Sequence, residues 1–155
     1  MWEGLAYRAL DDPGPARALF DFAAVSWPDD AEAVLGWGAF ATGTERLIGA
    51  VAAEQEARSV MLHGPVVVVD GGPTHVQPLD VAAQLVAAIL DHAVAAGAHT
   101  LFTRPQGLDR VWIRFGFIPV PEGFLPVGLA GRAGTGLYAW RGGSALWSPR
   151  DVAAG

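Results

Sequence analysis

The chain has 155 residues, of which 52% are hydrophobic, 17% charged and 10% aromatic, and it contains 20 Gly and 11 Pro. This composition is too apolar for an intrinsically disordered chain and too interrupted by Gly and Pro for a coiled coil, so we expect one folded domain. The absence of Cys excludes disulfides, zinc knuckles and thiol nucleophiles, and the net charge of −6 argues against a nucleic-acid backbone as the partner.

Three patterns predict the elements of the first part of the chain. Asp12-Pro13 opens a helix that runs to about Ala24. Gly43-Thr44-Glu45 is a hairpin signal between two strands. His63-Gly64-Pro65 interrupts the alternation of the last strand here, and Pro cannot donate to a sheet, so we expect a bulge or a local opening of the sheet. The predicted strands are 2–10, 34–42, 46–55 and 58–69.

The second part of the chain begins with a mostly buried helix over 78–96, in which apolar residues recur at every fourth position and Gly97 is the stop. The strand 99–103 follows at once, and this crossover predicts that it pairs in parallel with the preceding strand. A short helix over 107–115 and two last strands complete the domain, which spans residues 1–142; 143–155 form a C-terminal tail without a clear pattern. The last strands are 117–120 and 136–141, separated by a Gly-rich loop over 128–134.

Location is predicted from hydropathy. The longest apolar runs, around 66–69 and 81–90, are shorter than the roughly 18 to 20 residues that cross a bilayer, so we expect no membrane partner. The first residues, Met-Trp-Glu-Gly, lack the pattern of a secretory signal. We therefore expect a cytoplasmic protein.

One order of elements emerges: strand, helix, three antiparallel strands, helix, strand, helix and two strands. Residues 111–118, Val-Trp-Ile-Arg-Phe-Gly-Phe-Ile, resemble the helix ending in Gly-Phe that precedes the sixth strand of GNAT acyltransferases. The sequence resembles this family over about residues 1–141. The resemblance implies an α/β (α+β) fold with a mixed, mostly antiparallel sheet of about six or seven strands, helices on both faces, and acetyl-CoA as co-substrate.

In that family a Gln/Arg-x-x-Gly-x-Gly/Ala loop binds the coenzyme pyrophosphate at the start of a helix, where free amides and the helix dipole attract an anion. Residues 77–82 align with it: Gln77 and Ala82 fit, whereas Asp80 replaces the central Gly and Pro78 has no amide to donate. Either Asp80 binds the first-turn amides and CoA binding is weak or absent, or Asp80 points away and the amides remain. The cofactor contacts implied by the resemblance are Val67, Val68, Val69, Gln77, Leu79, Asp80, Val81, Ala82, Ala83 and Trp112.

Candidate catalytic residues are a base for the amine and an acid for the departing thiolate. The family often has a Tyr acid four residues before Gly-Phe, but Trp112 stands there, and Tyr138 is the replacement candidate. His63 and Glu54 are the candidate bases, and His63 has a reference pKa near neutrality. Each candidate also has a non-catalytic interpretation: Tyr138 as a packing residue, His63 as a structural residue and Glu54 as a solvated carboxylate. Four scattered His without metal-ligand spacing predict no metal site.

Two functions follow from the resemblance. The first is an acyl-CoA-dependent N-acyltransferase, with acetyl as the expected group, that acts on a primary amine of a small molecule or peptide by direct transfer. The alternative is a catalytically inactive GNAT-like binding or assembly module that has lost CoA binding, which Pro78, Asp80 and Trp112 favour. Pairing through the last two strands makes a homodimer one option.

Overall fold

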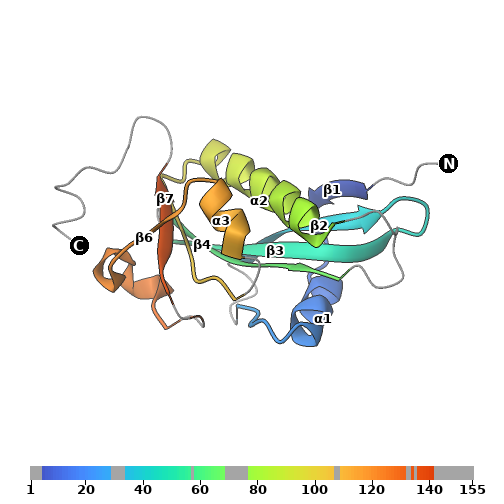
Figure 1. Cartoon of the computed structure of the whole chain (residues 1–155), viewed down its shortest axis with the longest axis horizontal. Coiled ribbons are helices and arrows are strands. Elements are labelled where there is room, and N and C mark those ends of the chain that lie inside the picture. The colour runs from blue at the N-terminus through green and yellow to red at the C-terminus, as the bar shows by residue number, and fades with distance from the viewer. Residues whose placement is uncertain are drawn as a thin grey trace.

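The computed structural model describes residues 5–28, 34–56, 58–68, 77–106, 109–131, 134 and 136–141. Seven strands form one sheet in the order β1-β2-β3-β4-β5-β7-β6 (Figure 1). The β4–β5 pair is parallel and the other five pairs are antiparallel, which confirms the predicted mixed, mostly antiparallel sheet. The strands are β1 (Leu5–Ala9), β2 (Val34–Ala41), β3 (Arg46–Glu56), β4 (Ser59–Val67), β5 (Thr100–Thr103), β6 (Ile118–Pro119) and β7 (Tyr138–Arg141). The predicted tail, 143–155, lies outside the described residues.

Helices cover both faces of this sheet, as predicted. Helices α2 and α3 lie on one side and α1 lies on the other (Figure 1). We call these sides the α2 face and the α1 face. Two short 3-10 helices follow β6, each preceded by a Pro that presets the backbone for a turn. The first, η2, lies in a stretch for which the sequence predicts no element, and η3 overlaps the start of the predicted Gly-rich loop. The helices are α1 (Gly14–Phe22), α2 (Pro78–Ala95), α3 (Asp109–Arg114), η2 (Glu122–Phe124) and η3 (Val127–Leu129).

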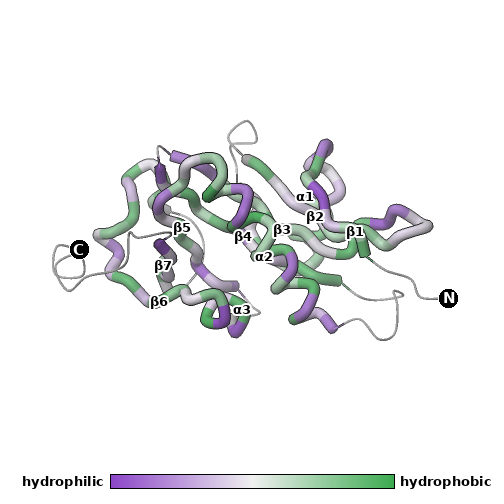
Figure 2. Tube along the Cα trace, turned by 90° about the horizontal axis from the view of Figure 1, so that it is seen from above, coloured by the Kyte–Doolittle hydropathy of each residue, from purple (hydrophilic) through white to green (hydrophobic). Residues whose placement is uncertain are grey.

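The core is divided by the sheet into an α2 side and an α1 side. On the α2 face, the predicted stripe of Val81, Leu85 and Ile89 is buried against the sheet. On the α1 face, Phe20 of α1 forms one cluster, and Leu129 of η3 belongs to a second. Figure 2 shows hydrophobic residues along the central strands. The helix segments therefore dock through apolar faces, the largest favourable term in folding.

Helix α2 has 18 residues and a mean hydropathy of 1.3, so its length and composition alone would allow it to cross a membrane. This differs from the sequence analysis, which counted only uninterrupted apolar runs. In the structure seven α2 residues are buried, and the helix packs on β2, β3 and β4. Such packing is typical of a core helix.

The sheet opens between β4 and β5. Pairing joins Ser59–Leu62 of β4 to Thr100–Thr103 of β5, whereas β4 continues to Val67 without a β5 partner among the described residues. We call the segment from His63 to Val67 the opening. The register with β3 shifts there, because three β4 steps from His63 to Val66 face two β3 steps from Ala52 to Ala50. The predicted bulge and local opening are confirmed.

Candidate functional site

Two of the candidate catalytic residues form one buried pair at the start of the opening. His63 on β4 is 6% exposed, Glu54 on β3 is 3% exposed, and the His63 Nε2–H donates to Glu54 Oε1 at 2.7 Å. His63 is directly opposite Ala52, and Glu54 lies two residues further along β3, so the bond runs diagonally between side chains on the same face. The structure therefore brings His63 and Glu54 together.

This pair lies on the α1 face, between two apolar clusters. Ala52, opposite His63, packs with Phe20 of α1. Met61, opposite Glu54, packs with Leu129 of η3. With Nε2–H held by the Glu54 carboxylate, the lone pair of the neutral imidazole lies on Nδ1. Such a ring is held in one orientation with its lone pair on the nitrogen away from Glu54, which is the arrangement that a general base needs.

Tyr138 lies beside the opening, on the other face of the sheet. It is opposite Thr103 on β5, and Thr103 is opposite Leu62 in the last β4–β5 pair. Tyr138 is half-buried and packs against the core cluster under α2. The structure thus separates the candidate acid from the His63–Glu54 pair by the thickness of the sheet.

The open edge of β4 offers one of the three expected peptide groups. The Val68 N–H donates to the Ile48 carbonyl at 2.7 Å and therefore faces β3. Because backbone polar groups alternate along a strand, the N–H and C=O of Val67 face the open side. Val69 lies outside the described residues.

At the start of α2, the Asp80 carboxylate is exposed and accepts no hydrogen bond within the described part of the chain, so Asp80 does not cap this helix. The N–H groups of Asp80 and Val81 both donate to the Gln77 carbonyl, at 3.0 and 3.2 Å. The Leu79 N–H has no acceptor among the described residues. Burial, followed by the charge of Asp80, raises the pKa of Tyr7. The first-turn amide left for an anion is that of Leu79.

The side chains of the other expected cofactor contacts are buried or half-buried. The side chains of Val81 and Ala82 are buried against the sheet, and Ala83 is half-buried. Trp112 is 0% exposed and packs edge-on against Phe117 with ring centroids 5.0 Å apart. Trp112 therefore belongs to the core in this structure and presents no surface to a ligand.

Two residues at the opening carried no signal that the sequence analysis used. Thr103, the last residue of β5, is buried and its hydroxyl donates to the Leu62 carbonyl at 3.2 Å. Arg104 follows, and its guanidinium donates two hydrogen bonds to Glu122 of η2, one of them 3.0 Å long. These bonds raise the pKa of Arg104 and lower the pKa of Glu122. Their partners are 41 and 18 residues apart, which no local pattern reveals.

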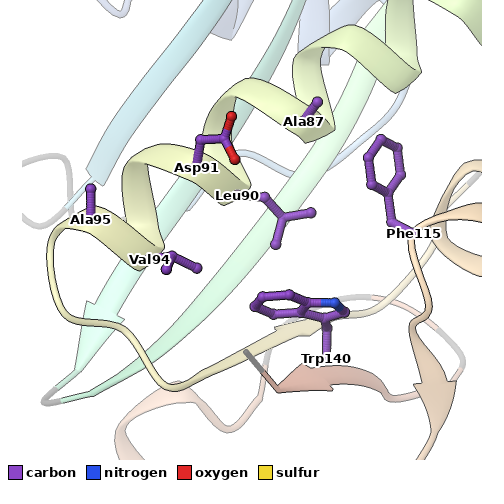
Figure 3. Close-up of a pocket in the computed structure, with 7 residues that line it drawn as sticks. All are labelled: Ala87, Leu90, Asp91, Val94, Ala95, Phe115 and Trp140. Atoms are coloured by element: carbon purple, nitrogen blue, oxygen red, sulfur yellow. The ribbon is translucent and has the colours of Figure 1, made fainter. Parts of the chain in front are cut away.

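A surface groove of about 670 Å³ lies at the C-terminal half of α2, at the opposite end of the helix from Gln77 (Figure 3). Trp140 and Leu90 face each other across it, and Asp91 is its charged residue. The groove is distinct from the opening. Within the described residues, no group of three or more His, Asp or Glu could hold a metal ion.

No protein-family model and no curated protein matches the chain. Solved structures do. A GNAT-family N-acetyltransferase from Escherichia coli in complex with CoA is 20% identical, with a TM-score of 0.64, over 91% of this chain and 83% of that one. The E. coli ribosomal-protein-S18-alanine N-acetyltransferase is 15% identical, with a TM-score of 0.63, over 93% and 99%.

N-acetylglutamate synthase from Neisseria gonorrhoeae, complexed with coenzyme A and N-acetyl-glutamate, is 18% identical with a TM-score of 0.63. That match covers 91% of this chain and 35% of the synthase. At sequence identities this low, the matches show a shared backbone fold. The chain has the GNAT fold, as its sequence resemblance implied.

Proposed function

We propose that this chain is an acyl-CoA-dependent N-acyltransferase, with acetyl-CoA as the expected donor, that transfers the acyl group directly to a primary amine of a small molecule or peptide. The observation that carries the proposal is the His63–Glu54 pair, buried at 2.7 Å at the first residue of the opening. The fold is shared with acetyltransferases whose structures hold CoA, which supports the cofactor class.

The donor would be held by backbone groups. The free peptide edge at Val67 suits the amide-bearing arm of CoA, and the Leu79 N–H with the positive end of α2 suits its diphosphate. The fit is reduced by Pro78, which has no N–H, and by the negative charge of Asp80. The chain thus retains a binding edge but fewer anion donors.

The chemistry then divides between the two faces. The amine nitrogen attacks the thioester carbonyl carbon, a C–N bond forms, the C–S bond breaks and the sulfur leaves as a thiolate. On the α1 face, His63 Nδ1 takes the proton that the amine loses, and Glu54 stabilises the imidazolium. On the α2 face, Tyr138 gives a proton to the thiolate. One proton leaves the amine and one reaches the sulfur, so the step balances.

A second function is favoured by the start of α2. Of the first three helix residues, Pro78 has no N–H and the Asp80 N–H already donates to the Gln77 carbonyl, so Leu79 is the one that retains an N–H for an anion. A GNAT-like binding or assembly module without CoA would show this loss. Such a module has no need for the buried His63–Glu54 pair, and this is why we place the transferase first.

Thermal unfolding with and without acetyl-CoA tests the proposal. A ligand at a hundred times its dissociation constant adds about 2.7 kcal/mol to the free energy of unfolding, so binding raises Tm by several degrees. Mass spectrometry of amines and peptides incubated with acetyl-CoA then detects the added acyl group. Equal Tm values with and without millimolar acetyl-CoA would exclude the transferase and leave the binding module.

A further inference from the structure

The last β4–β5 pair is completed by a side chain. The Leu62 carbonyl points toward β5, because it accepts the hydroxyl of Thr103 at 3.2 Å. In a parallel ladder, this carbonyl would accept the N–H of the residue after its register partner, which is Arg104. β5 ends at Thr103, and the Arg104 side chain reaches η2 through Glu122. The Thr103 hydroxyl is thus a side-chain donor to the last β4 carbonyl of the β4–β5 pairing.

This hydroxyl is also buried away from solvent. Thr103 is 0% exposed, and Leu62 is 1% exposed. A buried carbonyl without a donor costs free energy, so a sheet that simply ended at Leu62 would tend to extend its pairing or to admit water. The hydroxyl donates to the carbonyl of the last paired β4 residue, so the pairing ends on a satisfied group and the strands separate at His63.

We propose that Thr103 is a positioning residue that sets the point where β4 and β5 separate, and thereby holds His63 and the free Val67 peptide in the geometry for an acyl-CoA thioester. The consequence for acyl-CoA rests on the proposed function, whereas the effect on the strand edge does not. Loss of the hydroxyl shifts the edge that carries Val67 while the His63–Glu54 bond, formed with β3, persists. The dissociation constant for CoA therefore changes more than kcat.

Two matched pairs test this role. Thr103→Val removes the hydroxyl at nearly constant shape, and Thr103→Ser keeps it. Thr103→Ala, compared with Thr103→Ser, repeats the test at smaller volume if the Val variant does not fold. Thr100→Val removes a second buried hydroxyl from the other end of β5 and is the control. We expect the Kd for CoA, measured by calorimetry, to rise at least about fivefold in the Val and Ala variants, as for the loss of one hydrogen bond.

Thr103→Ser and Thr100→Val should bind CoA within about twofold of the unchanged chain. A Thr103→Val variant that binds CoA as tightly as the unchanged chain would overturn the proposal. Hydrogen exchange in the free protein separates this outcome from a failure of the proposed function. If the unchanged chain binds no CoA, faster exchange confined to residues 60–68 in the Val variant still supports Thr103, and unchanged exchange there overturns it.

Discussion

His63 and Glu54 share a 2.7 Å hydrogen bond although the register sets His63 against Ala52 and Glu54 against Met61. The diagonal reach is possible because both side chains leave the same face of adjacent strands. The pair is buried between the clusters of Phe20 and Leu129, so each partner satisfies a group that apolar neighbours cannot. The pair should therefore matter to both catalysis and stability.

His63→Gln should lower kcat about 10²- to 10⁴-fold, because the variant keeps a polar side chain but has no base near neutral pH. The KM for acetyl-CoA should change little, since His63 is assigned to the amine and not to the cofactor. Steady-state kinetics and the pH profile of kcat check this. A variant that retains most of its kcat would show that His63 has a structural role.

Glu54→Leu should destabilise the fold by about 3 kcal/mol, because it leaves the His63 ring buried without its carboxylate. The double variant Glu54→Leu with His63→Phe should regain part of this loss, since two apolar groups leave no buried polar atom unpaired. Urea denaturation of the two single variants and the double variant completes the cycle. Additive losses would show that the two side chains are not coupled.

Much of this architecture follows from local pattern. The helical stripe of Val81, Leu85 and Ile89, the hairpin at Gly43 and the break at Gly64-Pro65 each reflect chemistry within a few residues, and all three are confirmed. The sequence indicates His63 and Glu54 as two separate candidates, and their pairing depends on the register between β3 and β4.

The remaining site depends on long-range geometry. The contacts of Thr103 with Leu62 and of Arg104 with Glu122 join segments that only the complete sheet brings together. For Asp80 the sequence leaves two options open, and the structure shows the one in which its carboxylate accepts no hydrogen bond from the first-turn amides of the described residues. Capping preferences describe what a residue can do at a helix start, whereas the tertiary structure determines whether its side chain does so.

Gly64→Ala should weaken the fold and distort the opening. Gly64 has φ +93°, and an added Cβ would lie 3.0 Å from Phe20 Cζ and 3.2 Å from the Val66 nitrogen. Gly43 is the matched control, with φ +94° and no atom within 4 Å of its added Cβ. The left-handed backbone alone costs about 1–2 kcal/mol in each variant, so Gly64→Ala should lose at least about 1 kcal/mol more than Gly43→Ala in urea denaturation. Equal losses of unfolding free energy in the two variants would mean that Phe20 moves aside without cost.

Asp80→Asn should tighten CoA binding. A carboxylate about 4 Å from a phosphate charge costs roughly 1 kcal/mol in water and up to about 4 near a protein surface, so we expect at least about a fivefold lower Kd by calorimetry. The pKa of Tyr7 should fall part of the way toward its ordinary value, because the Asp80 charge is lost. Burial remains and keeps the pKa raised. Asp91→Asn, at the far end of α2, is the charge control. A lowered pKa of Tyr7 together with an unchanged Kd for CoA would show that Asp80 does not oppose the diphosphate.

Glu122→Gln should remove a pH-dependent contribution to stability. The hydrogen bonds from Arg104 lower the pKa of Glu122 below its ordinary value of 4.5 in the folded chain. A lowered folded-state pKa stabilises the fold above the unfolded-state pKa, and this stabilisation is lost as pH falls through the folded-state value. The unchanged chain should therefore exceed the variant in the free energy of unfolding at pH 7 and lose that advantage in acid, below about pH 4.5.

The size of this effect is set by exposure. The Glu122 side chain is 65% exposed, so solvent screening keeps the contribution below about 1 kcal/mol. Glu45→Gln is the matched control, because Glu45 also binds an Arg, at 2.8 Å, but Arg8 is 46% exposed whereas Arg104 is 10% exposed. The better shielded pair should contribute more, and its loss should also free η2 from the end of β5. Unfolding free energies that run parallel from pH 7 to pH 3 in the unchanged chain and Glu122→Gln would show that this bridge does not form in solution.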